Sequence, residues 1–205
     1  MLKQKLILAS GSPRRLDLLK QIGLEPDRLM PMDLDETPGR AEHPRSLARR
    51  LSGEKALAAG NLVKTDLEWR TAYILAADTV VAVGRRILGK AEFADDARAS
   101  LHLLSGRSHW VYTGVCVITP AGQLRQKVVE TKVRFKRLSR KEIDIYVASN
   151  QWQGKAGAYG IQGVAGVFVQ KMSGSYTNVV GLPLFETAQM LAGEGFDVMS
   201  GWMEA

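Results

Sequence analysis

The sequence predicts an α/β fold in which helices flank a mixed β-sheet, and two observations carry this prediction. Short apolar segments of strand-like composition alternate along the chain with segments that have the period of amphipathic helices. Two strand segments, about residues 110–119 and 126–138, are joined by the turn Pro120-Ala121-Gly122, which predicts an antiparallel hairpin. An antiparallel pair in such a chain implies a mixed sheet.

The first element is a short buried strand at residues 6–9, which the turn Ser10-Gly11-Ser12 connects to a helix. Ser12 is expected to be the N-cap, Pro13 the first helical residue, and Gly23 the stop. A polar connection over residues 31–43 follows this helix.

Arg14 and Arg15 lie in the first turn of that helix, where the macrodipole disfavours positive charge by some tenths of a kcal/mol each. A break of a local rule is typical of a functional site. The serine-glycine-serine turn, the helix-start N–H groups and two guanidinium groups together would form a phosphate cradle. The alternative, given equal weight, is a capped helix with solvated arginines.

Pro44 begins a second helix, whose apolar face is expected to consist of Leu47, Leu51, Ala58 and Leu62. Lys55, preceded by Glu54, falls inside this apolar stripe. Its ammonium group either extends to solvent or reaches into a cleft to pair with an anion. For a lysine considered alone, extension to solvent is the commoner outcome.

Asp78 and Thr79 interrupt the most apolar strand region of the chain, between residues 73–77 and 80–83. A carboxylate in such a setting requires a partner, which a metal ion, an ion pair or a role as general base would each supply. A turn without chemistry is the alternative, and the functional interpretation is favoured because no helix follows for Asp78 to cap.

The segment Gly84 to Ala91 nearly matches a phosphate-binding loop, but Ala91 lacks the hydroxyl that such a loop uses to bind magnesium. Residues 85–88 are instead expected to form a hairpin return, and Lys90 remains a candidate phosphate-facing cation. The later expected elements are a helix over residues 94–104, a helix from Ser139 to about residue 148 with Glu142 in a capping box, a Gly-rich segment over residues 154–181, and a last helix around residues 184–191.

Glycines recur at every third position from Gly154 to Gly166. We expect them to let the backbone pack closely or approach a ligand, although structural bends alone would also explain them. Lys155, Tyr159 and Gln162 lie among these glycines as candidate ligand contacts.

The composition limits the classes of function. The 205 residues suit one domain over residues 1–205, and no apolar run approaches the roughly 20 residues that a membrane span needs. Cys116 is the only cysteine, which excludes intrachain disulfides and cysteine zinc clusters and, with no apparent secretion signal, favours the cytoplasm. The net charge of +7 suits polyanionic partners but, with the basic residues scattered, selects none.

Six blocks of the sequence, in order from residue 10 to 183, resemble the Maf family of nucleotide pyrophosphatases. They are Ser10-Gly11-Ser12-Pro13-Arg14-Arg15, Glu54-Lys55-Ala56, Ala76-Ala77-Asp78-Thr79-Val80-Val81, Gly89-Lys90, residues 155–163, and Gly174-Ser175-Tyr176 through Gly181-Leu182-Pro183. The chain departs from the family at Ala91, where members usually carry proline.

The resemblance implies one domain with two lobes around a deep groove, as in inosine-triphosphatase-like folds. It also implies hydrolysis between the α and β phosphates of a nucleoside triphosphate, a divalent cation (Mg²⁺ or Mn²⁺), a cytoplasmic location and a homodimer. By this resemblance Asp78 is the catalytic acid/base. The substrate-binding residues are Ser10, Arg14, Arg15, Lys55, Thr79, Lys90 and Gln162, and the candidate metal-site carboxylates are Glu36, Glu54 and Asp78.

Arg15, Thr79 and Gln162 resemble the family branch that cleaves dTTP and UTP, with modified nucleotides as further candidate substrates. One alternative is a pyrophosphatase for 7-methyl-GTP or other modified nucleotides. Another is a non-catalytic nucleotide- or nucleic-acid-binding regulator of cell division, although no aromatic-basic binding motif is present and no stable nucleic-acid complex is expected.

Overall fold

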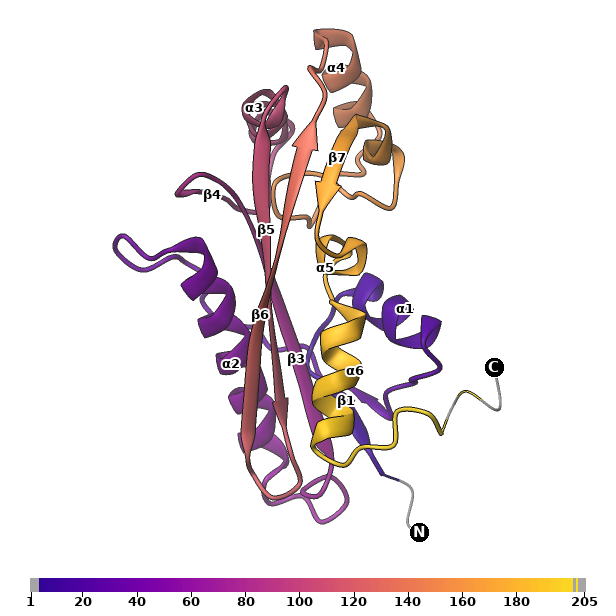
Figure 1. Cartoon of the computed structure of the whole chain (residues 1–205). Helices are drawn as coiled ribbons and strands as arrows, with labels where there is room; N and C mark the ends of the chain where they lie inside the picture. Colours follow the sequence, from indigo (N-terminus) through magenta and orange to yellow (C-terminus); the bar gives the residue numbers. More distant parts are fainter. Residues whose placement is uncertain (1–3, 201, 203–205) are drawn as a thin grey trace.

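Three long antiparallel strands form the axis of the molecule (Figure 1), and the computed structural model describes residues 4–200 and 202. The strands are β1 (Leu6–Leu8), β2 (Arg28–Leu29), β3 (Tyr73–Val83), β4 (Arg86–Leu88), β5 (Ser108–Ile118), β6 (Leu124–Phe135) and β7 (Val169–Ser173). The helices are α1 (Pro13–Gln21), α2 (Pro44–Val63), α3 (Ala94–Leu104), α4 (Arg140–Ala148), the 3₁₀ helix η1 (Val164–Phe168), α5 (Tyr176–Val180) and α6 (Leu184–Gly193).

The sheet is mixed, as the sequence predicts. Its strand order is β2-β1-β3-β5-β6-β7, and β4 pairs with β3 outside this path. Strand β1 is parallel to both β2 and β3, whereas the β3-β5-β6-β7 pairs and the β3-β4 pair are antiparallel. The predicted α/β class with flanking helices is therefore confirmed.

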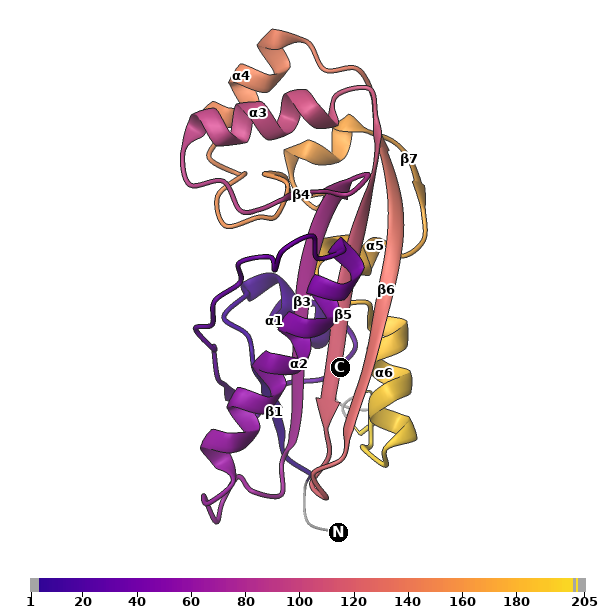
Figure 2. The ribbon, with the colours of Figure 1, turned by 90° about the vertical axis from the view of Figure 1, so that its left-hand side faces the viewer.

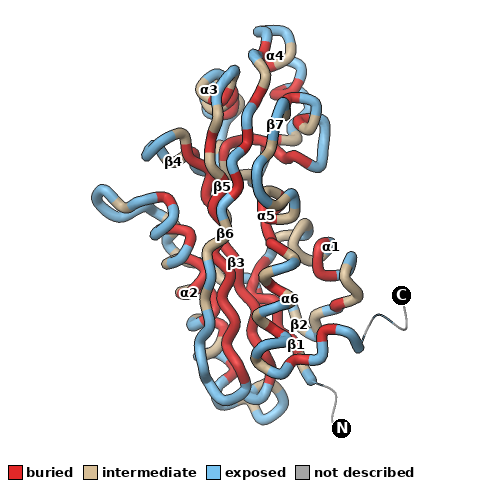
Figure 3. The backbone as a smooth tube through the Cα atoms, viewed as in Figure 1, coloured by how far each residue is buried: buried red, intermediate tan, exposed pale blue. Residues whose placement is uncertain are grey.

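Alternate residues of β3 pack into different cores, as expected for a strand that is covered on both faces. Leu75, Ala77 and Val81 join the larger core, which includes side chains from α1, α3, α4 and α6. Ala76 and Val80 face the other way and pack with α2. Figure 3 shows buried residues continuing along β3 and β5.

The flanking elements gather around the two ends of the long strands. Helices α3 and α4 lie with η1 and β4 near one end, whereas α1, α2, α6 and β1 lie toward the other, as Figures 1 and 2 both show. Strands β3, β5 and β6 run through both groups, so the same sheet supports both ends. Among the described helices, none is both long and apolar enough to cross a lipid bilayer.

The structure corrects the predicted apolar face of α2. Leu47 and Leu51 are buried, but Leu62 is 65% exposed and Ala58 only partly buried, so these two assignments were wrong. The buried stripe continues at intervals of four residues through Lys55, Ala59 and Val63. This spacing keeps Lys55 at the centre of the face that packs against the sheet.

The sequence suggested that Asp78 and Thr79 interrupt a strand. The structure shows instead that the strand is continuous through both residues. They lie in the middle of the 11-residue strand β3, paired with Gly114 and Thr113 of β5. Polar side chains are tolerated there because both have hydrogen-bond partners.

Most other element predictions are confirmed, including Ser12 as N-cap of α1 and the capping box of Ser139 and Glu142. The hairpin return at β4 and the helix α3 are also present. Strand β2 and the three elements inside the Gly-rich segment, η1, β7 and α5, were not predicted.

Candidate functional site

A cavity of about 500 Å³ opens at an unpaired part of the edge of β3. Strand β1 pairs with Tyr73–Leu75 and β4 pairs with Val81–Val83. Between these pairings, residues 76–80 of β3 pair only with β5, and Asp78 and Thr79 line the cavity at the opposite, unpaired edge. The polar residues that line the cavity are Ser10, Ser12, Arg14, Arg15, Glu36, Lys55, Asp78, Thr79, Lys90, Gln153, Lys155, Tyr159 and Gln162.

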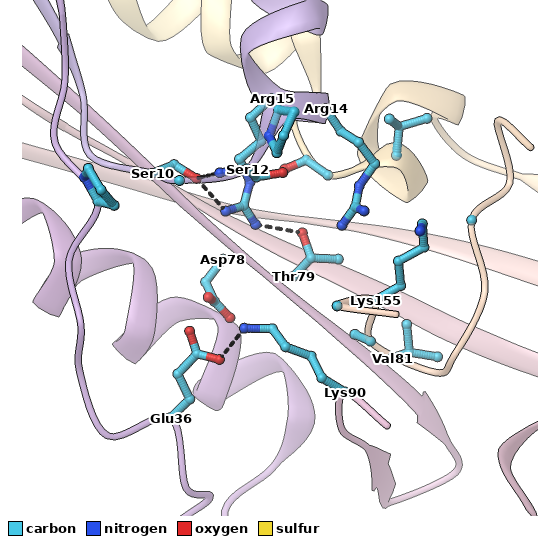
Figure 4. A pocket seen from close by; sticks show the side chains of 18 of the residues that line it. Ser10, Ser12, Arg14, Arg15, Glu36, Asp78, Thr79, Val81, Lys90 and Lys155 are labelled. Atoms are coloured by element: carbon cyan, nitrogen blue, oxygen red, sulfur yellow. Dashed lines mark hydrogen bonds and ion pairs between the residues drawn. The ribbon is translucent and has the colours of Figure 1, made fainter. Parts of the chain in front are cut away.

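The sheet edge explains how side chains from both faces reach one cavity. Successive side chains of a strand point to opposite faces, so Asp78 points toward α2 and Thr79 toward α1 and α5. Both nevertheless line the same cavity (Figure 4), because it extends around the edge of β3.

Lys55 of α2 binds two carboxylates in the cavity. Its ammonium group donates to Oδ1 of Asp78 and, at 2.6 Å, to Oε1 of Glu36, and its side chain is 9% exposed. The sequence left open whether this lysine extends to solvent or reaches an anion, and the structure shows the second arrangement. Glycine at position 114 allows α2 to approach closely, because a Cβ there would meet the carbonyl oxygen of Ala48 at 2.1 Å.

Glu36 comes from the long connection before α2 and lies between two lysines. Its Oε2 accepts a hydrogen bond from Lys90 at 2.7 Å, while its Oε1 accepts from Lys55. Burial raises the pKa of Glu36, but the hydrogen bonds from Lys55 and Lys90 outweigh it and lower that pKa to about 2. Glu36 is therefore ionised at neutral pH.

Arg15 is held by three neutral oxygen atoms. Its Nε donates to the Gly181 carbonyl (2.8 Å), Nη1 to Ser10 Oγ (3.0 Å) and Nη2 to Thr79 Oγ1 (3.3 Å). Burial lowers the pKa of Arg15, and Asp78 opposes that shift through its charge. A guanidinium has five N–H groups, so two remain for a bound anion. A partly buried cation whose direct partners are neutral is suited to a phosphate.

The turn before α1 contributes more side chains than free main-chain N–H groups to the cavity. Pro13 has no N–H, and the N–H of Ser12 donates to Ser10 Oγ at 3.2 Å. The turn lies at the carboxyl end of β1 and lines the cavity, but it leaves fewer free helix-start N–H groups than the predicted phosphate cradle would use.

The cavity is strongly cationic. Arg14, Arg15, Lys55, Lys90 and Lys155 line it, against the two carboxylates of Glu36 and Asp78, which gives a formal charge of +3. Burial lowers the pKa of Arg14, whereas the pKa of Lys155 is lowered first by burial and then by the charge of Arg14. An oligophosphate would compensate this concentration of positive charge.

Two glycines of the Gly-rich segment shape the wall of the cavity. Gly157 has a φ of +69°, and a Cβ there would meet Val81 Cγ1 at 2.8 Å. A Cβ at Gly160 would meet Lys155 Cε at 2.8 Å and Gln162 Oε1 at 3.2 Å. The predicted close packing is thus present at both positions, and Lys155 and Gln162 lie beside it.

Tyr159 lines the cavity but is 5% exposed, and its hydroxyl group forms a 2.8 Å hydrogen bond with Nε2 of His109. His109 is buried, and burial lowers its pKa to about 4. These two residues support the cavity wall from the core side.

Glu54 lies apart from the other predicted site residues. It is absent from the cavity lining and pairs with Arg50 at 3.1 Å on the outer part of α2. Within the described residues, no group of three or more His, Cys, Asp or Glu side chains is arranged to hold a metal ion. Glu36 and Asp78 are nevertheless suited to Mg²⁺, which typically binds one or two carboxylates together with substrate phosphates.

A sequence model described as Maf-like protein matches residues 5–194. The chain belongs to the Maf-like family. The dTTP/UTP pyrophosphatase of Rhizobium etli is 73% identical over 203 residues, covering 99% of this chain and 98% of that protein. The dTTP/UTP pyrophosphatase of Agrobacterium fabrum is 71% identical over 202 residues, covering 98% of each. Among solved structures, the Staphylococcus aureus Ham1 protein aligns with a TM-score of 0.44 and 14% identity over 64% of this chain and 72% of that chain.

Family membership confirms the resemblance seen in the sequence blocks, and the structure brings most of the Maf-like blocks together at one cavity. Its lining includes Ser10, Arg14, Arg15, Glu36, Lys55, Asp78, Thr79, Lys90 and Gln162. Sequence reasoning missed the Gly181 carbonyl that binds Arg15 and the buried Thr113 that contacts Thr79 at 3.0 Å. A main-chain carbonyl leaves no residue signature, and a threonine inside a β-strand is unremarkable by composition.

Proposed function

We propose that the protein hydrolyses dTTP and UTP to the monophosphate and pyrophosphate. The observation that carries this proposal is the cavity of charge +3, in which five cationic side chains surround the two carboxylates Glu36 and Asp78. A triphosphate supplies the matching negative charge. Relatives with over 70% identity are named dTTP/UTP pyrophosphatases, which supports the same substrate class.

The cationic side chains bind the phosphates, and Asp78 activates the water molecule that attacks the α-phosphorus. Lys55 donates to Oδ1 of Asp78, so Oδ2 is the oxygen that takes a proton from the attacking water. The oxygen of that water forms a bond to the α-phosphorus as the bond to the bridging oxygen breaks, and pyrophosphate leaves with the negative charge. Arg14, Arg15 and Lys155 stabilise the charge that develops on the phosphate oxygens.

A divalent cation, Mg²⁺ or Mn²⁺, is part of this proposal. Glu36 and Asp78 would hold it, since both carboxylates line the cavity and hard cations prefer oxygen ligands. When bound, the ion supplies charge neutralisation on the phosphates. Lys55 donates to both carboxylates and would keep them close together at the site where they would hold the ion.

Gln162 is the residue that we assign to base recognition. Its side chain is exposed at the cavity and offers both a donor and an acceptor, which match the N3–H and carbonyl edge shared by uracil and thymine. Cytosine lacks this N3–H and carries an amino group at C4. A site built for uracil would therefore leave a polar group unpaired with CTP.

The proposal also includes a cytoplasmic location and a homodimer. The single buried Cys116 suits a reducing compartment, and the dimer follows from the family resemblance. Light scattering of the purified chain would measure its mass in solution, and a monomer at micromolar concentration would contradict the dimer.

The test is kcat/KM for pyrophosphate release across dTTP, UTP, CTP, ATP, GTP and 7-methyl-GTP, repeated with Gln162→Ala. We expect dTTP and UTP to be the best substrates and to differ little from each other. We also expect Gln162→Ala to reduce the preference for dTTP and UTP over CTP. A best rate with 7-methyl-GTP or CTP would contradict the substrate assignment, and nucleotide binding without turnover would favour a regulatory protein over an enzyme.

A further inference from the structure

A directed chain of hydrogen bonds leads from Arg15 into the core. Thr113 Oγ1 lies 3.0 Å from the Asn178 carbonyl oxygen and 3.0 Å from Thr79 Oγ1. A carbonyl only accepts, so the single hydroxyl proton of Thr113 is donated to Asn178. Thr79 must then donate its own proton to Thr113, and its lone pairs face the Nη2 group of Arg15. Thr113 thus orients Thr79 as an acceptor for the guanidinium.

Asn178 also fixes the second partner of Arg15. Its buried side-chain amide donates to the Val111 carbonyl at 3.2 Å and to Thr131 Oγ1 at 2.9 Å, which ties α5 to both β5 and β6. Helix α5 ends directly before Gly181, whose carbonyl accepts from Arg15 Nε. The position of that carbonyl therefore depends on the attachment of Asn178.

We propose that Thr113 and Asn178 are positioning residues for triphosphate binding, which act by fixing the orientation of the Arg15 guanidinium. This inference rests on the proposed function for its substrate and identifies how the same site is held in place. Thr113 is fully buried, and we expect it to act only through Thr79 and Arg15. Loss of the Thr113 hydroxyl would leave Arg15 charged and bound to Gly181 and Ser10, but Thr79 would no longer be oriented to accept from its Nη2 group.

The test compares Thr113→Val with Thr113→Ser, measuring both kcat/KM for dTTP and the Kd of inorganic triphosphate by calorimetry. Valine keeps the shape and removes the hydroxyl, whereas serine restores it. We expect Thr113→Val to weaken triphosphate binding by about 10-fold, as for loss of a hydrogen bond to a charged group, and Thr113→Ser to remain within about 3-fold of the wild type. Thr187→Val is the matched control, because Thr187 is also buried in the core and its hydroxyl has no partner among the described residues. It should leave binding unchanged.

A second arm separates positioning from general support of the fold. In an Arg15→Lys background, Thr113→Val should cost less than 2-fold in triphosphate affinity, because the group that it orients is gone. An unchanged Kd in Thr113→Val, or the same loss in both backgrounds, would overturn the inference. Should Thr113→Val fail to fold, the cycle is repeated with Thr79→Val, which cuts the same chain. The wild type could bind triphosphate more tightly than Thr113→Val and yet not turn over dTTP. This result would refute the proposed function and support this inference.

Discussion

Asp78 and Thr79 are neighbours in β3 that point to opposite faces of the sheet and line the same cavity. Asp78 meets Lys55 from α2, and Thr79 meets Arg15 from α1. In the proposed function, the edge of one strand thereby combines the carboxylate that activates the attacking water with an anchor for a cation that binds phosphate. This arrangement requires that the pairing of β1 with β3 ends at Leu75 and that the pairing of β4 with β3 begins at Val81.

The cations of the cavity should bind the triphosphate group and contribute little to monophosphate binding. We expect Arg14→Ala to weaken dTTP binding by about 1.5–3 kcal/mol, the range for a charge-assisted hydrogen bond, and to change dTMP binding much less. Lys55→Met should have a similar effect and should also bring Glu36 and Asp78 into repulsion. Lys20→Ala, on the same helix as Arg14 but paired with Glu25 outside the cavity, is the control of equal charge. Equal losses of affinity for dTTP and dTMP would show that Arg14 and Lys55 only support the fold.

Metal removal should abolish turnover. Both predicted ligands that line the cavity, Glu36 and Asp78, are carboxylates, so we expect activity to vanish with excess chelator and return with Mg²⁺ or Mn²⁺. Glu36→Gln should raise the Mg²⁺ concentration that gives half-maximal rate. Glu54→Gln is the comparison, because Glu54 pairs with Arg50 and does not line the cavity. Full activity in chelator would refute the metal requirement. A higher Mg²⁺ requirement in Glu54→Gln alone would place the metal site at Glu54 instead of Glu36.

The fold class follows from local signals and spacing in the sequence, whereas most of the candidate site residues follow from the resemblance to the Maf family. Capping residues set the start of α4, and the four-residue spacing of apolar side chains on α2 puts Lys55 on the buried face. What could not be predicted depends on contacts between distant segments. The continuity of β3 through Asp78 depends on Lys55, which lies 23 residues earlier, and the position of Arg15 depends on a carbonyl 166 residues later.

Buried His109 should make stability depend on pH. Its pKa is lowered by burial to about 4, whereas the unfolded chain has the ordinary value of 6.5. Between these values the unfolded state binds the extra proton, so the free energy of unfolding should fall as pH decreases from 6.5 toward 4. The loss from pH 7.5 to pH 5 should be on the order of 2 kcal/mol.

Chemical denaturation of the wild type and His109→Gln at both pH values measures this effect. The variant keeps a polar side chain near Tyr159 and has no imidazole to titrate, so its stability should decline less on acidification. Parallel pH profiles for the two proteins would show that His109 does not carry the dependence.

Gly114 should be required for the contact between α2 and the sheet. A Cβ at this position would meet main-chain and side-chain atoms of α2, at 2.1 Å from the Ala48 oxygen and 2.5 Å from Ser52 Oγ. Gly114→Ala should therefore destabilise the protein by roughly 1–3 kcal/mol and lower kcat by moving Lys55 away from Asp78. Gly122→Ala is a comparison in the β5–β6 turn, where a Cβ meets no neighbour but φ is +78°, so it should affect stability without a change in kcat. Normal stability in Gly114→Ala would contradict the close approach.

The most direct test of the account is to identify the products that wild-type protein and Asp78→Asn form from dTTP with Mg²⁺. We predict dTMP and pyrophosphate in equal amounts from the wild type, and a rate reduced by at least about 10²-fold in Asp78→Asn, since that variant lacks the proton acceptor. Circular dichroism would show that the variant is folded. Formation of dTDP and phosphate, or a near-normal rate in Asp78→Asn, would contradict the account.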